Sequence, residues 1–284
     1  MIIGGEKRPV IQNIRQATQD GELNRKVELG DPALSADQRR DVCMRWAQCR
    51  QTPSYRLRNF CARALEDVVG WAQNLDTQIV GLEHLKGVSG GAIVTSNHFS
   101  PLDSTIIRKL AKKTGRRRLY TVSQDTNFAV PGFIGFFLYY ADTIPITSDS
   151  HYTKESFLPL LRSLLDKKQW VLIYPEQEMW FHYRKPRPPK RGAYYYAAQC
   201  GVPVISCFVE MRPRDKRDNG EFYKVRHTLH ILPPIYPEAG ISPRENSIRM
   251  MQTDYRQKQQ AYEEIYGQAL SYAFQEQDIA GWMP

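Results

Sequence analysis

Short apolar, β-branched runs alternate along the chain with longer segments in which apolar residues recur every three to four positions. The short runs predict strands at residues 78–82, 92–96, 119–123, 143–147, 170–174 and 204–209. The periodic segments between them predict helices at residues 103–114, 133–140, 154–167 and 193–200. Because most strands are followed by a helix and then another strand, we predict an α/β fold, a largely parallel sheet flanked by helices.

Different patterns flank this alternation. Residues 1–36 mix glycine, proline and charge without sustained periodicity, and predict an extended N-terminal lead that is poorly ordered and carries little chemistry. Residues 37–76 have apolar positions at helical spacing, and Pro53 divides them into a predicted helical hairpin. Its apolar side is expected to pack on the core, although an aromatic and arginine-rich pair of helices can also lie on a membrane.

The rest of the chain, residues 77–284, is predicted to be one α/β domain that ends in a helix. Residues 222–231 follow Asn219-Gly220 and alternate apolar with polar positions, which predicts a strand with one exposed face. A last helix is expected at residues 243–274. At 284 residues with 42% hydrophobic composition, the chain is large enough to bury a substantial core.

Charge adds a constraint on partners. The formal net charge is +9, from 39 basic and 30 acidic residues, and much of the excess lies at residues 108–118, 184–191 and 212–217. Such clusters indicate anionic partners. Nucleic acid, an anionic membrane surface and a phosphate-bearing substrate all satisfy this requirement, and charge alone does not choose among them.

The cysteines and the N-terminus favour a reducing, cytoplasmic compartment. The five cysteines show no metal-ligand or paired spacing, and the first residues lack the apolar core of a signal peptide. The uncharged apolar run at residues 128–141 is shorter than the ~20 residues that span a bilayer. We therefore expect no transmembrane helix, and we expect this run to be buried rather than to dip into a membrane interface.

The first candidate site is Asn97-His98-Phe-Ser-Pro-Leu-Asp103, directly after the strand predicted at 92–96. A histidine whose second ring nitrogen faces a carboxylate is a general base near neutral pH. A structural alternative exists, because Ser100 could be a helix N-cap with Pro101 at the first helical position and Asp103 in a capping box. Both interpretations put the segment at the carboxyl edge of the sheet, where open α/β folds bind ligands.

A second candidate lies at the same predicted edge. The strand at 170–174 ends in Tyr174-Pro175-Glu176, so that Glu176 can point into a cleft, although a surface or helix-terminal acid is the alternative. The following loop, residues 183–193, carries five cations among prolines before a helix start, which suits phosphate binding. It lacks regularly interleaved aromatic residues, so no nucleic-acid partner is expected.

These segments resemble ordered blocks of the glycerolipid acyltransferases, the 1-acylglycerol-3-phosphate O-acyltransferase family. His98-Phe-Ser-Pro-Leu-Asp103 resembles the HxxxxD block, Tyr174-Pro-Glu176 the FPEG-type block and Val202-Pro-Val-Ile205 the VPV(I/V)P block. Residues 132–135 with 143–146 look like the remaining block. The order of the blocks across residues 77–210 is far more specific than any one of them.

The resemblance implies an O-acyltransferase that moves a fatty acyl chain from a thioester, acyl-CoA or acyl carrier protein, to the hydroxyl of a lysophospholipid such as lysophosphatidic acid. His98 would be the general base, oriented by Asp103, and the alkoxide would attack the thioester without an acyl-enzyme serine. Backbone N–H groups after Ser100 or at residues 132–135 would stabilise the oxyanion. No cofactor and no metal are expected, and the enzyme would be cytoplasmic, peripheral on the inner face of an anionic membrane.

The family also implies which residues contact substrate, with two departures in this chain. The predicted substrate-binding residues are Asn97, Ser100, Gly135, Glu176, Arg184, Lys185, Arg187 and Lys190. Family members commonly continue the glutamate block with glycine, threonine or serine, and arginine, whereas this chain has Gln177-Glu178-Met179. The middle block also lacks its closing arginine and reads Thr147-Ser148-Asp149. The loop cations would replace these anion ligands, or the acceptor carries a different head group.

The competing class is a non-catalytic basic protein that docks on a membrane or nucleic acid. In that case His98 and Asp103 would be structural, and salt-dependent binding would survive the loss of His98. A hydrolase that uses the same base on water is a third option. No Gly-x-Ser-x-Gly sequence lies between a predicted strand and a predicted helix, as the elbow of the α/β-hydrolases does, which argues against it.

Overall fold

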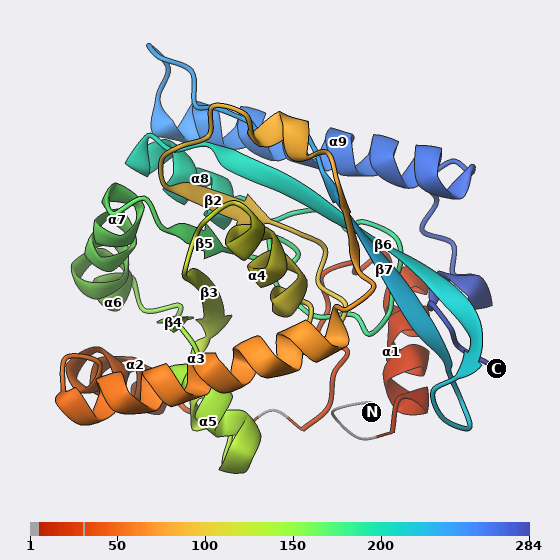
Figure 1. Ribbon diagram of the computed structural model, residues 1–284, viewed down its shortest axis with the longest axis horizontal. Coiled ribbons are helices and arrows are strands. Elements are labelled where there is room, and N and C mark those ends of the chain that lie inside the picture. Colours follow the sequence, from red (N-terminus) through yellow and green to blue (C-terminus); the bar gives the residue numbers. More distant parts are fainter. Residues whose placement is uncertain (1–5, 31) are drawn as a thin grey trace.

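The computed structural model describes residues 6–30 and 32–284, in which seven strands form one sheet (Figure 1). The strands are β1 Gln78–Val80, β2 Ala92–Thr95, β3 Leu119–Gln124, β4 Thr143–Ile146, β5 Trp170–Leu172, β6 Val204–Arg217 and β7 Tyr223–Ile231. Their order is β1-β7-β6-β2-β5-β3-β4. Strands β6, β2, β5, β3 and β4 are mutually parallel, β7 is antiparallel to β6, and β1 pairs in parallel with β7. The predicted α/β architecture with a largely parallel sheet is confirmed.

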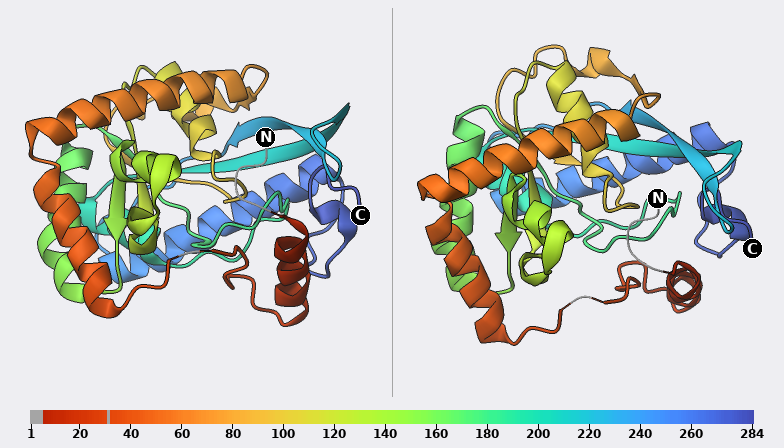
Figure 2. Two further views of the ribbon diagram at one scale, coloured as in Figure 1. Left: turned by 90° about the horizontal axis from the view of Figure 1, so that it is seen from below. Right: turned by 60° about the horizontal axis from the view of Figure 1, so that its bottom comes forward.

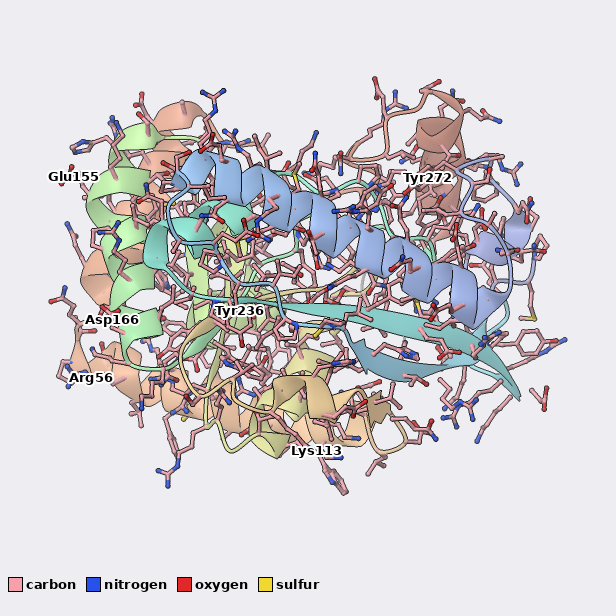
Figure 3. All side chains as sticks on the ribbon, turned by 90° about the horizontal axis from the view of Figure 1, so that it is seen from above. Arg56, Lys113, Glu155, Asp166, Tyr236 and Tyr272 are labelled. Atoms are coloured by element: carbon pink, nitrogen blue, oxygen red, sulfur yellow. The ribbon has the colours of Figure 1, made fainter. Side chains whose placement is uncertain are left out.

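Helices cover both faces of this sheet. They are α1 Arg8–Gln19, α2 Ala36–Cys49, α3 Pro53–Gln73, α4 Ser104–Lys113, α5 Gly132–Tyr140, α6 Ser150–Tyr152, α7 Leu158–Asp166, α8 Gly192–Cys200 and α9 Pro243–Tyr266. Ile93 and Val171 enter a core shared with α7 and α8, whereas their neighbours Val94 and Leu172 enter a core shared with α4. This two-sided burial explains why the central strands are apolar at every position. Helix α9 crosses the sheet on the α8 side (Figure 3).

The N-terminal lead predicted as extended is instead partly helical. Helix α1 has Pro9 in its first turn and buries Val10, Ile11 and Ile14, which recur at helical spacing. These side chains pack in one cluster with Trp180 and other residues from distant parts of the chain. Figures 1 and 2 show α1 beside the β6–β7 hairpin. The prediction was wrong because the apolar period of α1 is short, and the residues that bury it are distant in the sequence.

The predicted helical hairpin is present, but its apolar side is not fully covered. Helix α2 starts at a capping box formed by Ser35 and Gln38, and α3 starts at Pro53 after the N-cap Thr52. The expectation that the apolar side packs on the core fails along α3, where Phe60 is 61% and Trp71 is 69% exposed. None of the helices that the structure describes combines the length and hydropathy needed to cross a bilayer.

Three further expectations need correction. The last helix stops at Tyr266 rather than at residue 274, because Gly267 adopts a left-handed conformation that ends it. Strand β6 continues to Arg217 and forms with β7 a hairpin that projects beyond the other strands (Figure 1). The apolar run at 128–141 is not uniformly buried, since Phe133 on α5 is 66% exposed.

Candidate active site

The candidate site forms where the segments after β2 and β5 meet. These strands are parallel neighbours, so both segments leave the carboxyl edge of the sheet, as predicted. The two segments also pair with each other beyond the strands. The N–H of Trp180 donates to the carbonyl of His98 at 3.1 Å, and that of His182 donates to the carbonyl of Phe99 at 2.9 Å. The main chain at His98 is therefore held by the loop that carries Glu176.

His98 and Asp103 form the predicted pair. His98 Nδ1 lies 2.8 Å from Asp103 Oδ2, and the same oxygen accepts the N–H groups of Phe99 at 2.9 Å and Ser100 at 3.1 Å. A carboxylate that accepts from Nδ1–H fixes the tautomer in which Nε2 carries the lone pair. His98 retains 21% side-chain exposure, and no described residue makes a hydrogen bond to Nε2. The geometry thus leaves Nε2 of this half-buried histidine without a partner among the described residues.

Tyr174 supports this pair from the other segment. Its ring stacks on the His98 imidazole, with centroids 3.9 Å apart and an interplanar angle of 12°. Its hydroxyl donates to Asp103 Oδ1, so both carboxylate oxygens are satisfied. Burial, followed by the neighbouring Asp103, raises the pKa of the Tyr174 hydroxyl well above its usual value, and the hydroxyl stays a donor. No role was predicted for Tyr174 from the sequence, although its place directly before Pro175-Glu176 was a usable signal.

The capping alternative for Asp103 is not what the structure shows. Helix α4 begins at Ser104, after a turn at residues 101–103, and Asp103 makes no side-chain cap. The Ser100 hydroxyl accepts from Leu102 N at 3.3 Å within that turn, so Ser100 is not the helix N-cap. The carboxylate of Asp103 points back to residues 98–100. Its hydrogen bonds serve the histidine and the turn rather than the helix.

Asn97, predicted to contact substrate, is turned away from solvent. Its Oδ1 accepts the N–H of Val209 at 2.8 Å and its Nδ2 donates to the Val209 carbonyl at 3.1 Å. The side chain is buried and therefore anchors the His98 segment to β6. One residue pair beneath it was missed from the sequence: Thr95 at the end of β2 donates to the fully buried Asp254 of α9.

The four predicted loop cations do not converge. Lys185 is buried and donates to Asp278 at 2.7 Å, and Arg187 is buried against Glu176 at 2.8 Å. Arg184 lies over the ring of Tyr266, and burial lowers its pKa.

Lys190 is different, because its side chain is exposed while its N–H donates to the Pro175 carbonyl at 2.7 Å. Of the four, Lys190 alone combines an exposed charge with a direct tie to the Tyr174-Pro175-Glu176 turn. The structure therefore does not bring the four cations together as the sequence predicted.

Gly135 has a packing role. It lies in α5, and a Cβ at this position would stand 1.7 Å from the carbonyl oxygen of Val130. Only glycine allows the helix to approach its own preceding loop so closely. Helix α5 packs on α3 and on the short helix Asp125–Ala129. The contacts of the described residues do not bring Gly135 to His98.

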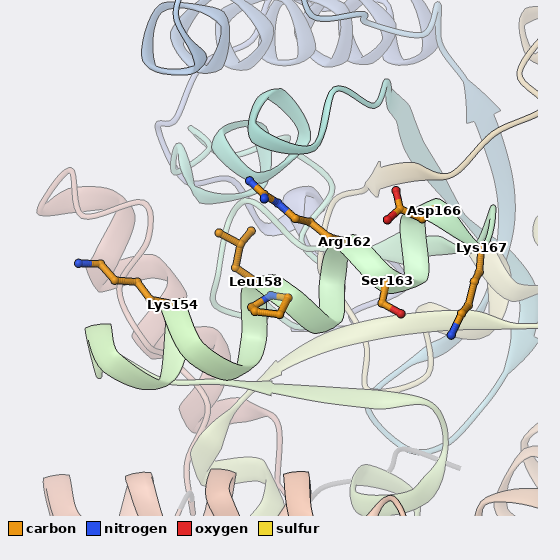
Figure 4. A pocket seen from close by; sticks show the side chains of 7 residues that line it. Lys154, Leu158, Arg162, Ser163, Asp166 and Lys167 are labelled. Carbon is orange, nitrogen blue, oxygen red and sulfur yellow. The ribbon is translucent and has the colours of Figure 1, made fainter.

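Neither a surface hollow nor a ligand cluster offers a competing site. A hollow of about 530 Å³ follows the outer side of α7 and contains none of the predicted site residues (Figure 4). It is lined by Lys154, Leu158, Pro159, Arg162, Ser163, Asp166 and Lys167. Within the described residues, no three His, Cys, Asp or Glu side chains are grouped to hold a metal ion.

The mostly parallel sheet thus carries at its carboxyl edge a histidine whose Nδ1 is held by a carboxylate. Residues 76–210 match the family model Acyltransferase. The fold is similar to the crystal structure of the 1-acyl-sn-glycerophosphate (LPA) acyltransferase PlsC from Thermotoga maritima, with 16% sequence identity, a TM-score of 0.50, and coverage of 81% of this chain and 89% of that chain. No curated protein sequence matches the chain.

The match to the family model covers just under half of the chain, and it includes His98, Asp103 and Glu176.

Proposed function

We propose that the protein transfers a fatty acyl chain from an acyl thioester to the free hydroxyl of a lysophospholipid, with His98 as general base. One observation carries this proposal: Nδ1 is held by Asp103 at 2.8 Å, while the side chain is 21% exposed and no described residue makes a hydrogen bond to Nε2. Nε2 takes the proton of the acceptor hydroxyl as its oxygen attacks the thioester carbonyl. The tetrahedral intermediate then expels the thiolate, which recovers that proton from the imidazolium. Asp103 stabilises the imidazolium in between.

The oxyanion donors expected after Ser100 are not free. The N–H groups of Phe99 and Ser100 donate to Asp103, that of Leu102 to the Ser100 hydroxyl, and that of Asp103 to the Ser100 carbonyl. A group that already donates inside the protein cannot also serve the intermediate at full strength. Donors for the oxyanion must therefore come from outside residues 99–103, and this part of the sequence-based expectation is not supported.

The acceptor's anionic group is assigned to Lys190 in this proposal. Its exposed ammonium stands on the loop that is bonded to Pro175, next to the motif turn. A flexible lysine acts as a point charge for phosphate, without the bidentate geometry of arginine. Replacement of Lys190 by alanine should raise KM for a phosphate-bearing acceptor and leave kcat nearly unchanged.

Membrane contact is proposed through the outer face of α3 and the start of α5, which pack against each other. The large exposed apolar residues on these helices are Leu57, Phe60, Leu65, Val68, Trp71, Phe133 and Ile134. Arg56 and Arg58 are exposed on the same helix as Phe60. Apolar area rimmed by cations suits peripheral binding to an anionic lipid surface, with the enzyme on the cytoplasmic face.

The decisive experiment is acyl transfer from radiolabelled long-chain acyl-CoA, with acyl carrier protein thioester in parallel, to a panel of lysophospholipids. Wild type should form labelled diacyl product, and a folded His98→Ala variant should lose it. The donor and head group that give product identify the substrates. Absence of product from either donor, with wild-type protein folded and bound to vesicles, would instead support a non-catalytic lipid-binding protein.

A further inference from the structure

Glu176 is buried, and both oxygens of its carboxylate are hydrogen-bonded within the protein. Its carboxylate is 3% exposed, and Oε1 accepts the N–H of Arg187 at 2.9 Å. Its Oε2 accepts from Arg187 Nε at 3.1 Å and Nη2 at 2.8 Å, and from the backbone N–H of His98 at 3.3 Å. Three of these donors reach Oε2 and one reaches Oε1, so both oxygens are paired in a side chain that is nearly closed to solvent. The group is thus committed to the protein interior.

Arg187 is committed in the same way. Its guanidinium is 2% exposed, Nη1 donates to the Leu23 carbonyl at 3.1 Å, and Nη2 also donates to the Glu178 carbonyl. One face of the group lies over the Trp180 ring, 4.5 Å from its centroid. To bind a phosphate, Arg187 would have to leave this buried pair, and a broken buried pair leaves an uncompensated charge.

A segment from the N-terminus covers this pair. We call Leu23, Asn24 and Arg25 the N-terminal strap. Besides the contact of Leu23 with Arg187, Asn24 Nδ2 donates to the carbonyls of Glu176 at 3.2 Å and Pro188 at 2.9 Å. The indole N–H of Trp180 donates to the Arg25 carbonyl at 2.9 Å. The strap lies outside residues 76–210, the part that matches the family model.

We infer that Glu176 and Arg187, closed in by the N-terminal strap, form a positioning pair that holds the His98 backbone and do not bind the acceptor. This inference rests on the proposed function, in which His98 is the base. His98 is held on both sides of its main chain, by Glu176 at its N–H and by Trp180 at its carbonyl. The imidazole is thereby set against Tyr174. A misplacement of the base by about 1 Å costs on the order of 100-fold in rate.

The first test separates positioning from binding by steady-state kinetics. In Glu176→Gln and Arg187→Lys variants, kcat should fall about 10- to 100-fold while KM for the lysophospholipid stays within about twofold. For Lys190→Ala we expect the opposite result, in which KM for the lysophospholipid rises and kcat stays nearly unchanged. A raised acceptor KM with kcat retained in the Glu176 or Arg187 variants would make these residues ligands and overturn the inference.

The strap offers a milder variant that keeps the buried charges intact. Asn24→Ala removes the two bonds to the motif loop and should lower kcat more than about threefold at unchanged KM. Asn13→Ala is the matched control, because Asn13 Nδ2 donates to the Val27 carbonyl at 3.0 Å within the N-terminal segment itself. If the Glu176 and Arg187 variants fail to fold, the kcat of Asn24→Ala tests the inference on its own. Equal kcat in wild type and Asn24→Ala would contradict the role of the strap.

A second readout does not depend on turnover. The chain has six histidines, so the imidazole signals of ¹⁵N-histidine-labelled protein can be followed individually by NMR. Asn24→Ala should shift the His98 signals, and Asn13→Ala should not. If wild type transfers no acyl group to any acceptor, the proposed function fails while this measurement still tests the positioning pair. Unmoved His98 signals in Asn24→Ala would show that the strap does not control the base.

Discussion

At the scale of the residue, Tyr174 links the two motif segments, because its ring stacks on His98 and its hydroxyl donates to Asp103. Tyr174→Phe keeps the stack and leaves Asp103 Oδ1 without its donor. An unsatisfied buried acceptor costs about 1–3 kcal/mol in the free energy of unfolding. If about 1.4 kcal/mol of this cost also raises the activation free energy of acyl transfer, kcat falls about tenfold.

This prediction is measured by acyl transfer together with urea unfolding of the same preparation. Tyr195→Phe is the control, since the Tyr195 hydroxyl only accepts a bond from Gln199 on α8. Full activity in Tyr174→Phe would mean that stacking alone orients the imidazole.

Gln177 carries a backbone conformation that the family's usual glycine would suit. Its φ is 67°, in the left-handed region, and its side chain is exposed. A non-glycine residue there costs about 1–2 kcal/mol, of which glycine's extra unfolded-state freedom cancels roughly half. Gln177→Gly should therefore raise the free energy of unfolding by about 0.5–1 kcal/mol.

Urea denaturation with an unchanged m-value is the measurement for this change. The exposed Gln260 inside α9 gives a control of opposite sign, because Gln260→Gly should destabilise by about 1 kcal/mol. A destabilised Gln177→Gly would show that the glutamine side chain makes a contact that outweighs the strain.

At the scale of the element, the strands and the edge where the chemistry lies were predictable from sequence, and the partners of charged groups were not. Strands β2 and β5 are short apolar runs, and parallel pairing alone brings His98 and Glu176 to one edge. The burial of Lys185 depends on Asp278, 93 positions away, and no local pattern contains that information. For α3, periodicity predicted an apolar side but could not say whether protein or lipid covers it.

Helix α1 is predicted to be part of the cooperative fold rather than a detachable lead. Ile14 is fully buried among residues from the motif loop and the C-terminal segment. Ile14→Ala should lower the free energy of unfolding by about 2–5 kcal/mol, from lost burial and the cavity left behind. The exposed Gln12 provides the control, because Gln12→Ala should change it by less than about 0.5 kcal/mol. An Ile14→Ala variant as stable as wild type would instead support the prediction of a poorly ordered N-terminal lead.

The outer face of α3 is predicted to control membrane affinity. Phe60 and Trp71 are both more than half exposed. Burial of either side chain in the lipid would contribute about 1.5–3 kcal/mol to the free energy of membrane binding. The double variant Phe60→Glu with Trp71→Glu should weaken binding to anionic vesicles more than tenfold in a sedimentation assay. Ile248→Glu changes an exposed apolar residue on α9 and should leave binding unchanged. Equal vesicle affinity of the double variant and wild type would exclude α3 as the contact.

At the scale of the whole molecule, buried titratable groups set how stability depends on pH. Burial is the main cause that lowers the pKa of His182 from 6.5 to about 3 and that of His227 from 6.5 to about 4. The unfolded chain then binds more protons below pH 6.5, so stability present above that pH is lost as pH falls toward 4 and 3. Each histidine contributes about 1.4 kcal/mol per pH unit.

Glu66 opposes this loss over part of the range. Burial raises the pKa of its carboxyl from 4.5 to about 7, so the folded state binds the proton better between those values and gains stability as pH falls. Between pH 6.5 and 4.5, Glu66 offsets one of the two histidines. The net slope is then about 1.4 kcal/mol per pH unit, and it should roughly double between pH 4.5 and pH 4, where both histidines contribute and Glu66 no longer offsets them.

The His227→Phe variant tests how much one histidine contributes to the pH dependence of the free energy of unfolding. The ring of His227 lies 5.4 Å from that of Phe99, and its buried Nε2 has no hydrogen-bond partner, so phenylalanine keeps the contact and removes an unsatisfied atom. Urea unfolding from pH 7 to pH 4 should show unchanged or higher stability at pH 7 and a slope lower by about 1.4 kcal/mol per pH unit below 6.5. His151→Phe, at an exposed position, should leave the slope as it is. An unchanged slope in His227→Phe would mean that His227 takes up its proton in the folded protein, and the interior behind Phe99 would then have to admit water.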